Sequence, residues 1–526
     1  MVYLDLTRPI TPGIASNEGG QVFQVDDFTR LRRFLILGSE GGTFYTSARD
    51  LSIENADVVR RCLDADFIKT IQMIVEVSEQ GVAPKNEPAI YALALAASHT
   101  GIITRKTALD ALPKVCRTGT HLLHFMKYCK AMRKSSRMYR TAIGKWFNDK
   151  PADKIAYQAV KYKQRDGWSL ADALRIARPT APTEQHNAVY KYIVDGQVNQ
   201  FTPNIISAVS LIQTQGAIMD IPSMIRKDRI PREAVPTEML NDPKIWEALL
   251  DDMPMTAMIR NLGKMTSVGL ITPGSNAAQK VILDLMNTDR LQRSRVHPIQ
   301  LLAALKVYEQ GRGIKGSLQW KPDKVILGAL DAAFYEAFKN ITPSGKRICL
   351  ALDVSSSMDG NRVNGMDFMD ARMASCAMAL VTAATEPNTT IVAYAKTLVP
   401  FEIRPSMRLD DVIRQAKAIP FGGTDCRLPI INALERGVAY DGFVSYTDSE
   451  TTASNGGFYG HANRSFYRDV LALYRGSVVK GARSVVVGVT ATHISLNDPA
   501  DVLGLDVVGF DSSAPAVISD FIAGKV

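Results

Sequence analysis

The spacing of apolar residues changes abruptly at Pro343-Ser344-Gly345, and this change limits the possible folds more than any other feature of the chain. Before it, from about residue 56 to residue 340, apolar residues recur every three or four positions, which is the pattern of successive amphipathic helices. After it, short β-branched runs alternate with helical patterns, as in a parallel sheet covered on both faces. The chain therefore needs two architectures, and 526 residues are too many for one ordinary core.

The first part, residues 1–345, is predicted to be an all-α domain. Its helical segments are about 10–20 residues long and are joined by short turns, with no strand between them. This stretch is long for a helix bundle, so paired-helix repeats of the HEAT kind, at about 40 residues each, fit it better. The run Ser169-Leu170-Ala171-Asp172 has the form of a capping box and predicts the start of one helix.

The second part, residues 346–526, is predicted to be an α/β domain with a doubly wound, mostly parallel sheet. Five apolar, β-branched runs predict its strands, at residues 348–352, 389–395, 442–448, 484–489 and 506–510. Helical patterns lie between them at residues 368–382, 409–418, 429–436 and 467–473.

Oxygen-rich loops adjoin several of these elements. The strand Ile348–Leu352 stops at Asp353 and three serines, and further loops of this kind lie at residues 422–425 and 446–450. Because loops at the carboxyl ends of parallel strands gather along one edge of the sheet, we expect their side chains to converge. The expected ligands are Asp353, Ser355, Ser357, Thr424 and Asp448. Such oxygens suit Mg²⁺, although the first loop by itself is also compatible with a serine-rich turn.

The three loops together resemble the metal-dependent adhesion site of the von Willebrand factor A domain. Few acids and open water positions would leave the ion electrophilic, able to accept a carboxylate from an unknown acidic partner. A phosphatase of the haloacid dehalogenase type also places an aspartate after a buried strand, but it needs a second aspartate two residues on, where this chain has Ser355. No glycine-flanked serine nucleophile or His-Glu-x-x-His motif occurs. We therefore expect no catalytic activity.

Positive charge is concentrated in one segment. Residues 101–180 carry 18 basic and 5 acidic residues, or +13, whereas residues 346–526 carry 17 and 19, or −2. This imbalance predicts a polyanionic partner for the helical domain. The candidate RNA-binding residues are Lys114, Arg117, Lys127, Lys130, Arg133, Lys134, Arg137, Arg140, Lys161, Lys163, Arg165, Arg175 and Arg178.

Aromatic residues are interleaved with these basic ones. They are His121, His124, Tyr128, Tyr139 and Trp146. Aromatic rings offer stacking surfaces for unpaired bases, while Lys and Arg bind phosphates. The same rings could equally pack in the hydrophobic core between the helices.

Several classes of protein are disfavoured by composition. No apolar run approaches the ~20 residues of a membrane span, and the N-terminus lacks a basic segment followed by an apolar core, so neither membrane insertion nor secretion is expected. The six cysteines form no Cys-x-x-Cys pair. Buried, reduced thiols in a cytoplasmic protein are the simplest expectation.

The whole chain resembles the Ro autoantigen (TROVE) family, in which a helical-repeat domain with a basic patch precedes a von Willebrand A domain. We interpret the chain as a bacterial member. The matching stretches are Arg33-Phe34, Gly38-Ser39-Glu40-Gly41-Gly42-Thr43, Lys163-Gln164-Arg165-Asp166-Gly167-Trp168-Ser169, Met253-Pro254, Arg260-Asn261-Leu262-Gly263-Lys264-Met265, Leu330-Asp331-Ala332-Ala333-Phe334-Tyr335 and Gly422-Gly423-Thr424-Asp425-Cys426.

The resemblance implies a ring of HEAT-like repeats closed by the A domain. It implies that single-stranded ends of misfolded or immature noncoding RNAs enter the central hole, and that Y RNA binds an outer basic surface that includes residues 161–178. In bacterial members of the family, an exoribonuclease can join the complex of protein and RNA. One departure stands at Arg178, where the family pattern has a histidine. Phosphate contact would survive that change, but a base-specific contact is in doubt.

The chain thus supports competing functional hypotheses. The first is an RNA-binding scaffold in noncoding-RNA quality control. The second is a metal-dependent adhesion module that binds proteins and has an incidental basic face. The third is a metal-dependent phosphatase, which turnover of generic phosphate esters with Mg²⁺ would reveal.

Overall fold

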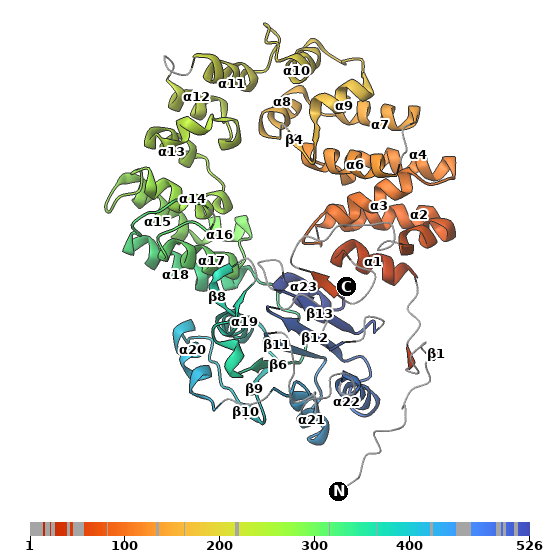
Figure 1. The fold of residues 1–526 in the computed structure, drawn as a ribbon, viewed down its shortest axis with the longest axis vertical. Helices are drawn as coiled ribbons and strands as arrows, with labels where there is room; N and C mark the ends of the chain where they lie inside the picture. Colours follow the sequence, from red (N-terminus) through yellow and green to blue (C-terminus); the bar gives the residue numbers. More distant parts are fainter. Residues whose placement is uncertain are drawn as a thin grey trace. The chain divides into compact units, whose positions relative to one another are not determined.

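A computed structural model describes residues 14–15, 21–22, 27–38, 43–45, 57–81, 83–132, 136–162, 164–215, 220–314, 316–363, 366–420, 424–448, 464–490, 496–497, 501–509 and 514–525. The chain divides into two compact units, each described by itself below (Figure 1). The helical unit comprises Leu51–Asp284 and Leu318–Ile326. The α/β unit comprises Met1–Asp50, Leu285–Ser317 and Leu327–Val526.

The helical unit is a succession of helices joined by turns and loops (Figure 1). Its helices are α2 (Asp57–Gln80), α3 (Glu87–Ala97), α4 (Ile102–Asp110), α5 (Leu112–Val115), α6 (Gly119–Ala131), α7 (Arg137–Asn148), α8 (Ala152–Lys161), α9 (Leu170–Ala177), α10 (Glu184–Asp195), α11 (Asn204–Gln215), α12 (Ile221–Asp228), the short η3 (Arg232–Ala234) and η4 (Thr237–Asn241), α13 (Pro243–Asp251), α14 (Met255–Ser267) and α15 (Asn276–Met286). The prediction of an all-α array is confirmed, and within the described residues the helices are accompanied by a hairpin of β4 (Gln164–Arg165) and β5 (Trp168–Ser169).

Side-chain caps set where several of these helices begin. The Thr118 side chain accepts from the His121 N–H ahead of α6, and Ser136 accepts from the Tyr139 N–H ahead of α7. Ser169 and Asp172 form the reciprocal capping box predicted for α9. Each such cap stabilises its helix by about 1 kcal/mol.

Large aromatic side chains fill the interior of the helical unit. Trp146 and Trp246 are almost fully buried. Their indole N–H groups donate to the carbonyls of Cys116, at 2.5 Å, and Leu240, at 2.7 Å. Because buried polar groups are costly without a partner, these bonds allow both rings to lie in the core.

The α/β unit is built on a seven-stranded sheet in the order β10-β9-β6-β11-β12-β13-β3. Its strands are β3 (Thr43–Tyr45), β6 (Ile348–Asp353), β9 (Thr389–Tyr394), β10 (Leu398–Pro400), β11 (Gly442–Thr447), β12 (Arg483–Gly488) and β13 (Gly504–Val508), with β1 (Ile14–Ala15) and β2 (Gln21–Val22), and β7 (Arg362–Val363) and β8 (Met366–Asp370), forming separate pairs. Its helices are α1 (Asp27–Leu37), α16 (Thr288–Ser294), α17 (Pro298–Glu309), α18 (Lys324–Glu336), η5 (Ala337–Asn340), η6 (Ser356–Met358), α19 (Ala371–Thr385), α20 (Leu409–Ala418), α21 (Leu428–Glu435), α22 (Arg464–Ser477) and α23 (Ala514–Ile522).

Strand β6 is the third of the seven strands, at the point where the strand order reverses. It pairs in parallel with β9 on one side and with β11 on the other. Only β10, at the far edge, is antiparallel to its neighbour. The predicted doubly wound, mostly parallel sheet is therefore confirmed, and the loop after β6 opens at a switch point where such sheets bind ligands.

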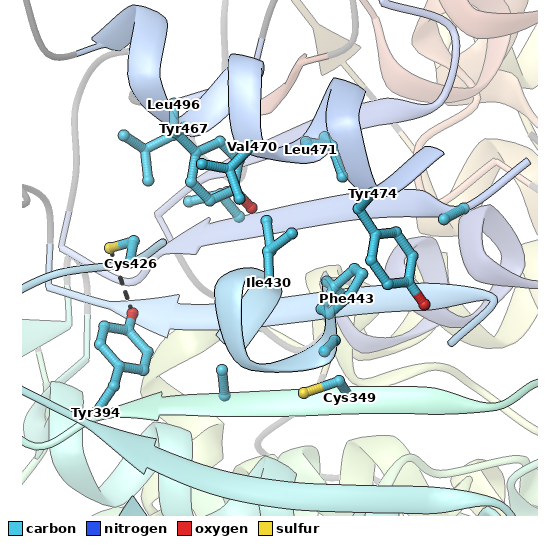
Figure 2. Close-up of a cluster of buried hydrophobic side chains, with 14 residues drawn as sticks. Cys349, Tyr394, Cys426, Ile430, Phe443, Tyr467, Val470, Leu471, Tyr474 and Leu496 are labelled. Carbon is cyan, nitrogen blue, oxygen red and sulfur yellow. Dashed lines mark hydrogen bonds between the residues drawn. The ribbon is translucent and has the colours of Figure 1, made fainter. Parts of the chain in front are cut away.

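Helices cover the sheet on both faces. Ile430 from α21 and Tyr467, Val470, Leu471 and Tyr474 from α22 form one buried cluster against the strands (Figure 2). Phe443 of β11 and Tyr474 pack edge to face, with ring centroids 4.9 Å apart. Helices α19 and α23 contact the strands as well.

The N-terminal segment is part of the α/β unit. Strand β3 pairs in parallel with β13 and completes the sheet. Arg33 of α1 is 2% exposed, and its guanidinium donates to the carbonyls of Asp501 and Val502. Residues 1–345 are predicted to form the helical domain, whereas α1 and β3 contact the C-terminal part and belong to the α/β unit.

Two further findings concern the class of protein. No helix within the described ranges has both the length and the apolar content needed to span a bilayer. All six cysteines are buried and free, as the sequence predicts.

Candidate nucleic-acid interface and metal centre

The β4–β5 hairpin and helix α6 together carry the centre of the predicted RNA-binding surface. The hairpin turns at Asp166 and Gly167, both with positive φ (51° and 75°), as a two-residue primed turn requires. Asp166 Oδ2 lies 2.6 Å from His124 Nδ1 and 3.7 Å from Lys127 Nζ, both on α6. The hairpin is thereby held against α6.

A lysine and a tryptophan meet across this contact. Lys130 Nζ of α6 lies 5.0 Å from the ring centroid of Trp168, which is partly exposed on β5. A lysine over an indole face is a cation–π arrangement. Trp168 is therefore an aromatic ring beside exposed cations, although the sequence analysis did not include it among the candidate binding residues.

Most of the predicted RNA-binding residues that the structure describes are exposed. This holds for Lys114, Arg117, Lys127, Lys130, Arg137, Arg140, Arg165, Arg175 and Arg178, and Lys161 is half-buried. Arg133, Lys134 and Lys163 lie outside the described residues. Within the described ranges, no acidic side chain pairs with Lys130, Arg137 or Arg140, so these cations are available to phosphates.

Other candidates are engaged by the protein itself. The Arg117 guanidinium donates to the backbone carbonyl and to the hydroxyl of Ser78, at 2.8 Å each. Arg175 pairs with Asp172 at 3.6 Å and donates to the Val194 carbonyl. Arg178 ends α9 in the left-handed conformation, with φ of 47°. The Arg178 Nε donates to the Arg175 carbonyl at 3.3 Å. These bonds hold the three side chains against the protein.

Most of the interleaved aromatic residues serve the core. Trp146 is fully buried, and Tyr139 is 8% exposed with its ring stacked on Phe125. Burial lowers the pKa of His121 to about 4, which keeps this imidazole neutral. Tyr128 packs edge to face on Tyr91, with ring centroids 4.9 Å apart. The core-packing interpretation therefore applies to these rings, and Trp168 is the better candidate for stacking on a base.

The metal loop follows β6 in the α/β unit. Asp353 is 2% exposed and accepts hydrogen bonds from the Ser355 N–H at 2.8 Å and from the Thr447 hydroxyl at 2.9 Å. The hydroxyls of Ser355 and Ser357 lie 3.1 Å apart. Three of the five predicted ligands thus share one short turn.

The other two predicted ligands come from neighbouring loops and are buried. Asp448 directly follows β11 and accepts from the Asn361 amide at 3.0 Å. Thr424 is 3% exposed. The next residue, Asp425, donates its N–H to the carbonyl of Ala395 just after β9. All three loops therefore lie at the carboxyl ends of the central strands.

The donor set fits a hard divalent cation. Burial raises the pKa of Asp353 to about 6, and the nearby Asp448 carboxylate also raises it, while hydrogen bonds from Ser355 and Thr447 oppose the shift. A pair of buried carboxylates that repel each other gains from an added positive charge. Oxygen donors alone, from carboxylates and hydroxyls, are the ligands that Mg²⁺ prefers. Within the described ranges, no cluster of three or more His, Cys, Asp or Glu side chains is arranged for a metal.

Comparison with known proteins decides the family. The TROVE domain model matches residues 14–206 and 225–346, and the Ro60 vWA domain model matches residues 347–522. The RNA-binding protein RO60 of Deinococcus radiodurans is 38% identical over 521 residues, covering 98% of this chain and 96% of that protein. This chain belongs to the Ro60 family.

Two further comparisons agree with this assignment to the Ro60 family. The RNA-binding protein RO60 of Caenorhabditis elegans is 32% identical over 593 residues, covering 98% of this chain and 90% of that protein. The crystal structure of the Deinococcus radiodurans RO (RSR) protein superposes with a TM-score of 0.88 at 37% identity, covering 95% of this chain and 100% of that one. The predicted family and fold class are confirmed.

Each of the two candidate sites lies within a different one of the two matched domains. All the predicted basic residues fall within the TROVE match, and all the predicted metal ligands fall within the vWA match. Thr447 and Asn361 hold the two carboxylates and were not among the predicted site residues. Thr447 could have been found, because it directly precedes Asp448. Nothing local marks Asn361, which is 87 residues from its partner.

Proposed function

We propose that this chain is an RNA-binding scaffold of noncoding-RNA quality control and has no catalytic role. The observation that carries the proposal is the row of exposed cations on α6, α7 and the β4–β5 hairpin, in a segment with a net charge of +13. Phosphates supply most of the affinity of such a surface. The relatives named RNA-binding protein RO60 support the same activity.

We propose that two kinds of RNA bind. A small structured RNA of the Y RNA type would lie on the outer basic surface around Lys130, Arg165 and Trp168. Single-stranded ends of misfolded or immature RNAs would enter the hole of a ring formed by the helical repeats and the A domain. An exoribonuclease that degrades such ends is a candidate partner. The proposed location of this activity is the cytoplasm.

We propose that Asp353, Ser355, Ser357, Thr424 and Asp448 hold Mg²⁺ for docking. A bound divalent ion would supply an open coordination position for a carboxylate from a partner protein. The residues of this chain would orient the ion: Asn361 holds the Asp448 carboxylate, and the Ser355 N–H and Thr447 hydroxyl hold that of Asp353.

RNA binding is tested by charge reversal. The double variant Lys130→Glu/Arg140→Glu should lower affinity for a structured RNA at least tenfold in 0.1 M salt, and should make the slope of log affinity against log salt shallower by about 1–2. Fluorescence anisotropy over a salt series gives both quantities.

The matched control is Lys227→Glu/Lys244→Glu, which makes the same change in net charge at exposed positions of α12 and α13. This control should retain most of the affinity and the original slope. Equal losses of RNA affinity in the two double variants would contradict a localised RNA-binding surface. Unchanged binding in the first would exclude α6 and α7 altogether and favour a metal-dependent module that binds only proteins.

A further inference from the structure

An aspartate stands at the tip of the β4–β5 hairpin, within the basic segment. It is Asp166, one of five acidic residues among residues 101–180, which carry 18 basic ones. A carboxylate repels the phosphates that such a surface attracts, so its presence there needs a reason. The reason lies in how the hairpin is attached to the helices around it.

The hairpin is too short to hold its own position. Each of its strands has two residues, and a two-stranded ribbon of this length is unstable without support from the rest of the protein. Arg165 and Trp168 are paired across the strands, directly beside the turn. The direction in which these two side chains point therefore depends on contacts that the hairpin makes with other elements.

Helix α9 supports the base of the hairpin. Ser169 ends β5 and is also the N-cap of α9, where it and Asp172 form the reciprocal capping box. The tip lies further from α9, and its two turn residues, Asp166 and Gly167, are exposed. The tip therefore needs an attachment of its own.

Asp166 supplies that attachment to α6. Its Oδ2 lies 2.6 Å from His124 Nδ1 and 3.7 Å from Lys127 Nζ. His124 is 6% exposed, and its Nδ1 is buried. An imidazole attracts a carboxylate at this distance when Nδ1 carries a proton, whether the ring is neutral or charged. Further along α6, Lys130 lies 5.0 Å from the ring centroid of Trp168.

We propose that Asp166 is a positioning residue for RNA binding. Its carboxylate holds the hairpin tip against α6, so that Arg165 and Trp168 form one surface with Lys130. This role rests on the RNA-binding function proposed above, and Asp166 does not itself contact the RNA. The alternative is that Asp166 is a solvated charge, which would only weaken the attraction of the surface for phosphates.

Asp166→Asn separates the two roles, because they predict changes of opposite sign. Asparagine tolerates the positive φ of this position, so the turn should persist, but its neutral side chain loses both charged contacts. The positioning role predicts at least threefold weaker affinity for a structured RNA in 0.1 M salt, although the basic segment gains one positive charge. A solvated charge predicts unchanged or tighter binding. Fluorescence anisotropy measures the affinity.

The matched control is Asp153→Asn, which makes the same change in net charge at an exposed position of α8. It should bind the RNA at least as tightly as the unmodified chain. A second variant, His124→Leu, keeps the aspartate and removes its buried partner, and it should reproduce the loss of affinity. Thermal unfolding of each variant establishes that it is folded before the titration.

A double-mutant cycle gives a readout that a general loss of stability would not change. Arg165→Gln should weaken RNA binding at least threefold in the unmodified chain. It should weaken binding less than twofold in the Asp166→Asn chain, because the tip is already displaced there. Arg140→Gln, on α7, should cost the same in both backgrounds.

These measurements can overturn the role of Asp166. The proposal is wrong if Asp166→Asn binds RNA as tightly as Asp153→Asn does, or if Arg165→Gln costs the same affinity in both backgrounds. A failure of the unmodified chain to bind RNA would instead overturn the proposed function, and the positioning role with it.

Discussion

Arg372 of α19 is an arginine with only 2% of its surface exposed, and it lies beneath the metal loop. Its Nη2 donates to the Ser355 carbonyl at 3.0 Å, and its Nε donates to Asp359 Oδ1 at 2.8 Å. One side chain therefore holds both ends of the turn that carries Ser355 and Ser357. A rigid turn of this kind places its hydroxyls before any cation arrives.

Replacing Arg372 with Met should loosen that turn. The Ser355 carbonyl loses a donor in a buried setting, so we expect a loss of about 2 kcal/mol in the free energy of unfolding, together with weaker Mg²⁺ binding. Urea denaturation and calorimetry measure the two effects. Arg414→Met is the control, because its pair with Asp411 is exposed and worth less than about 0.5 kcal/mol. Equal effects in the two variants would contradict this role for Arg372.

His297 is a partly buried histidine at the N-cap of α17. Its Nδ1 accepts from the Ile299 N–H at 3.1 Å, which requires the neutral ring. Burial lowers the pKa of His297 to about 4. In the unfolded chain the pKa is about 6.5. Between these values the unfolded chain binds the proton more tightly, so the stability that His297 contributes falls as the pH drops from 6.5 toward 4.

We therefore expect this histidine to contribute about 2 kcal/mol to the difference in stability between pH 7 and pH 5. His297→Asn keeps a good capping residue but cannot titrate. Urea unfolding of both proteins at the two pH values should show a smaller pH dependence in the variant. An unchanged pH dependence would mean that His297 does not resist protonation.

The candidate metal site combines residues that are neighbours in the sequence with residues that only the fold brings together. The spacing Asp353-x-Ser355-x-Ser357 predicts a turn that is present, because three predicted ligands of one loop are near one another in the sequence. The partner of the Asp353 carboxylate, Thr447, is 94 residues away and was not predicted. Asp425 looks like a ligand beside Thr424, yet its carboxylate is held by Arg427 through two 2.8 Å bonds. Such pairings depend on which strands become neighbours.

At the scale of elements, α1 and β3 form a clamp at the edge of the α/β unit. Strand β3 covers the edge of β13, and α1 inserts Arg33 over the Asp501–Val502 carbonyls. Burial lowers the pKa of Arg33 to about 10, so it stays charged at pH 7. Without this clamp, β13 would be an open edge strand, which invites association with other chains.

Arg33→Gln should destabilise the α/β unit by roughly 1–2 kcal/mol, because two partly buried carbonyls lose their donor. Arg30→Gln, one turn earlier on α1, is the matched control and should cost less than about 0.5 kcal/mol. Denaturant unfolding measures both, and light scattering should show more aggregation for Arg33→Gln. Similar stabilities of the two variants would indicate that the clamp contributes little.

Elements with their own local signal were predicted, and elements without one were not. The capping box at Ser169 specifies a helix, and that helix is present. The apolar periodicity of residues 58–80 predicts one long helix, whereas α2 is interrupted by non-helical backbone at Asp66, with φ of −156° and ψ of 90°. Strand β3 is three residues long, too short to show an alternating pattern, and is stabilised by β13 from the other end of the chain. The β4–β5 hairpin was missed for the same reason, although its Asp166-Gly167 turn is a recognised hairpin signal.

At the scale of the whole molecule, the concentrated positive charge and the predicted metal ligands lie in different parts of the chain. Residues 101–180 carry a net charge of +13, and residues 346–526, which contain all five predicted metal ligands, carry −2. A polyanion gains affinity from the first segment and none from the second. The two proposed activities should therefore be separable.

We expect a mutation that abolishes binding at one site to leave binding at the other site unchanged. Asp353→Ala/Asp448→Ala should abolish Mg²⁺ binding while changing RNA affinity less than twofold, because its net charge change lies outside the basic segment. Lys130→Glu/Arg140→Glu should do the reverse. Calorimetry with Mg²⁺ and anisotropy with a structured RNA, on both variants and with EDTA present or absent, complete the test. A loss of RNA binding in the first variant, or on chelation, would show that the metal loop takes part in holding RNA, and the separate docking role proposed for it would then have to be given up.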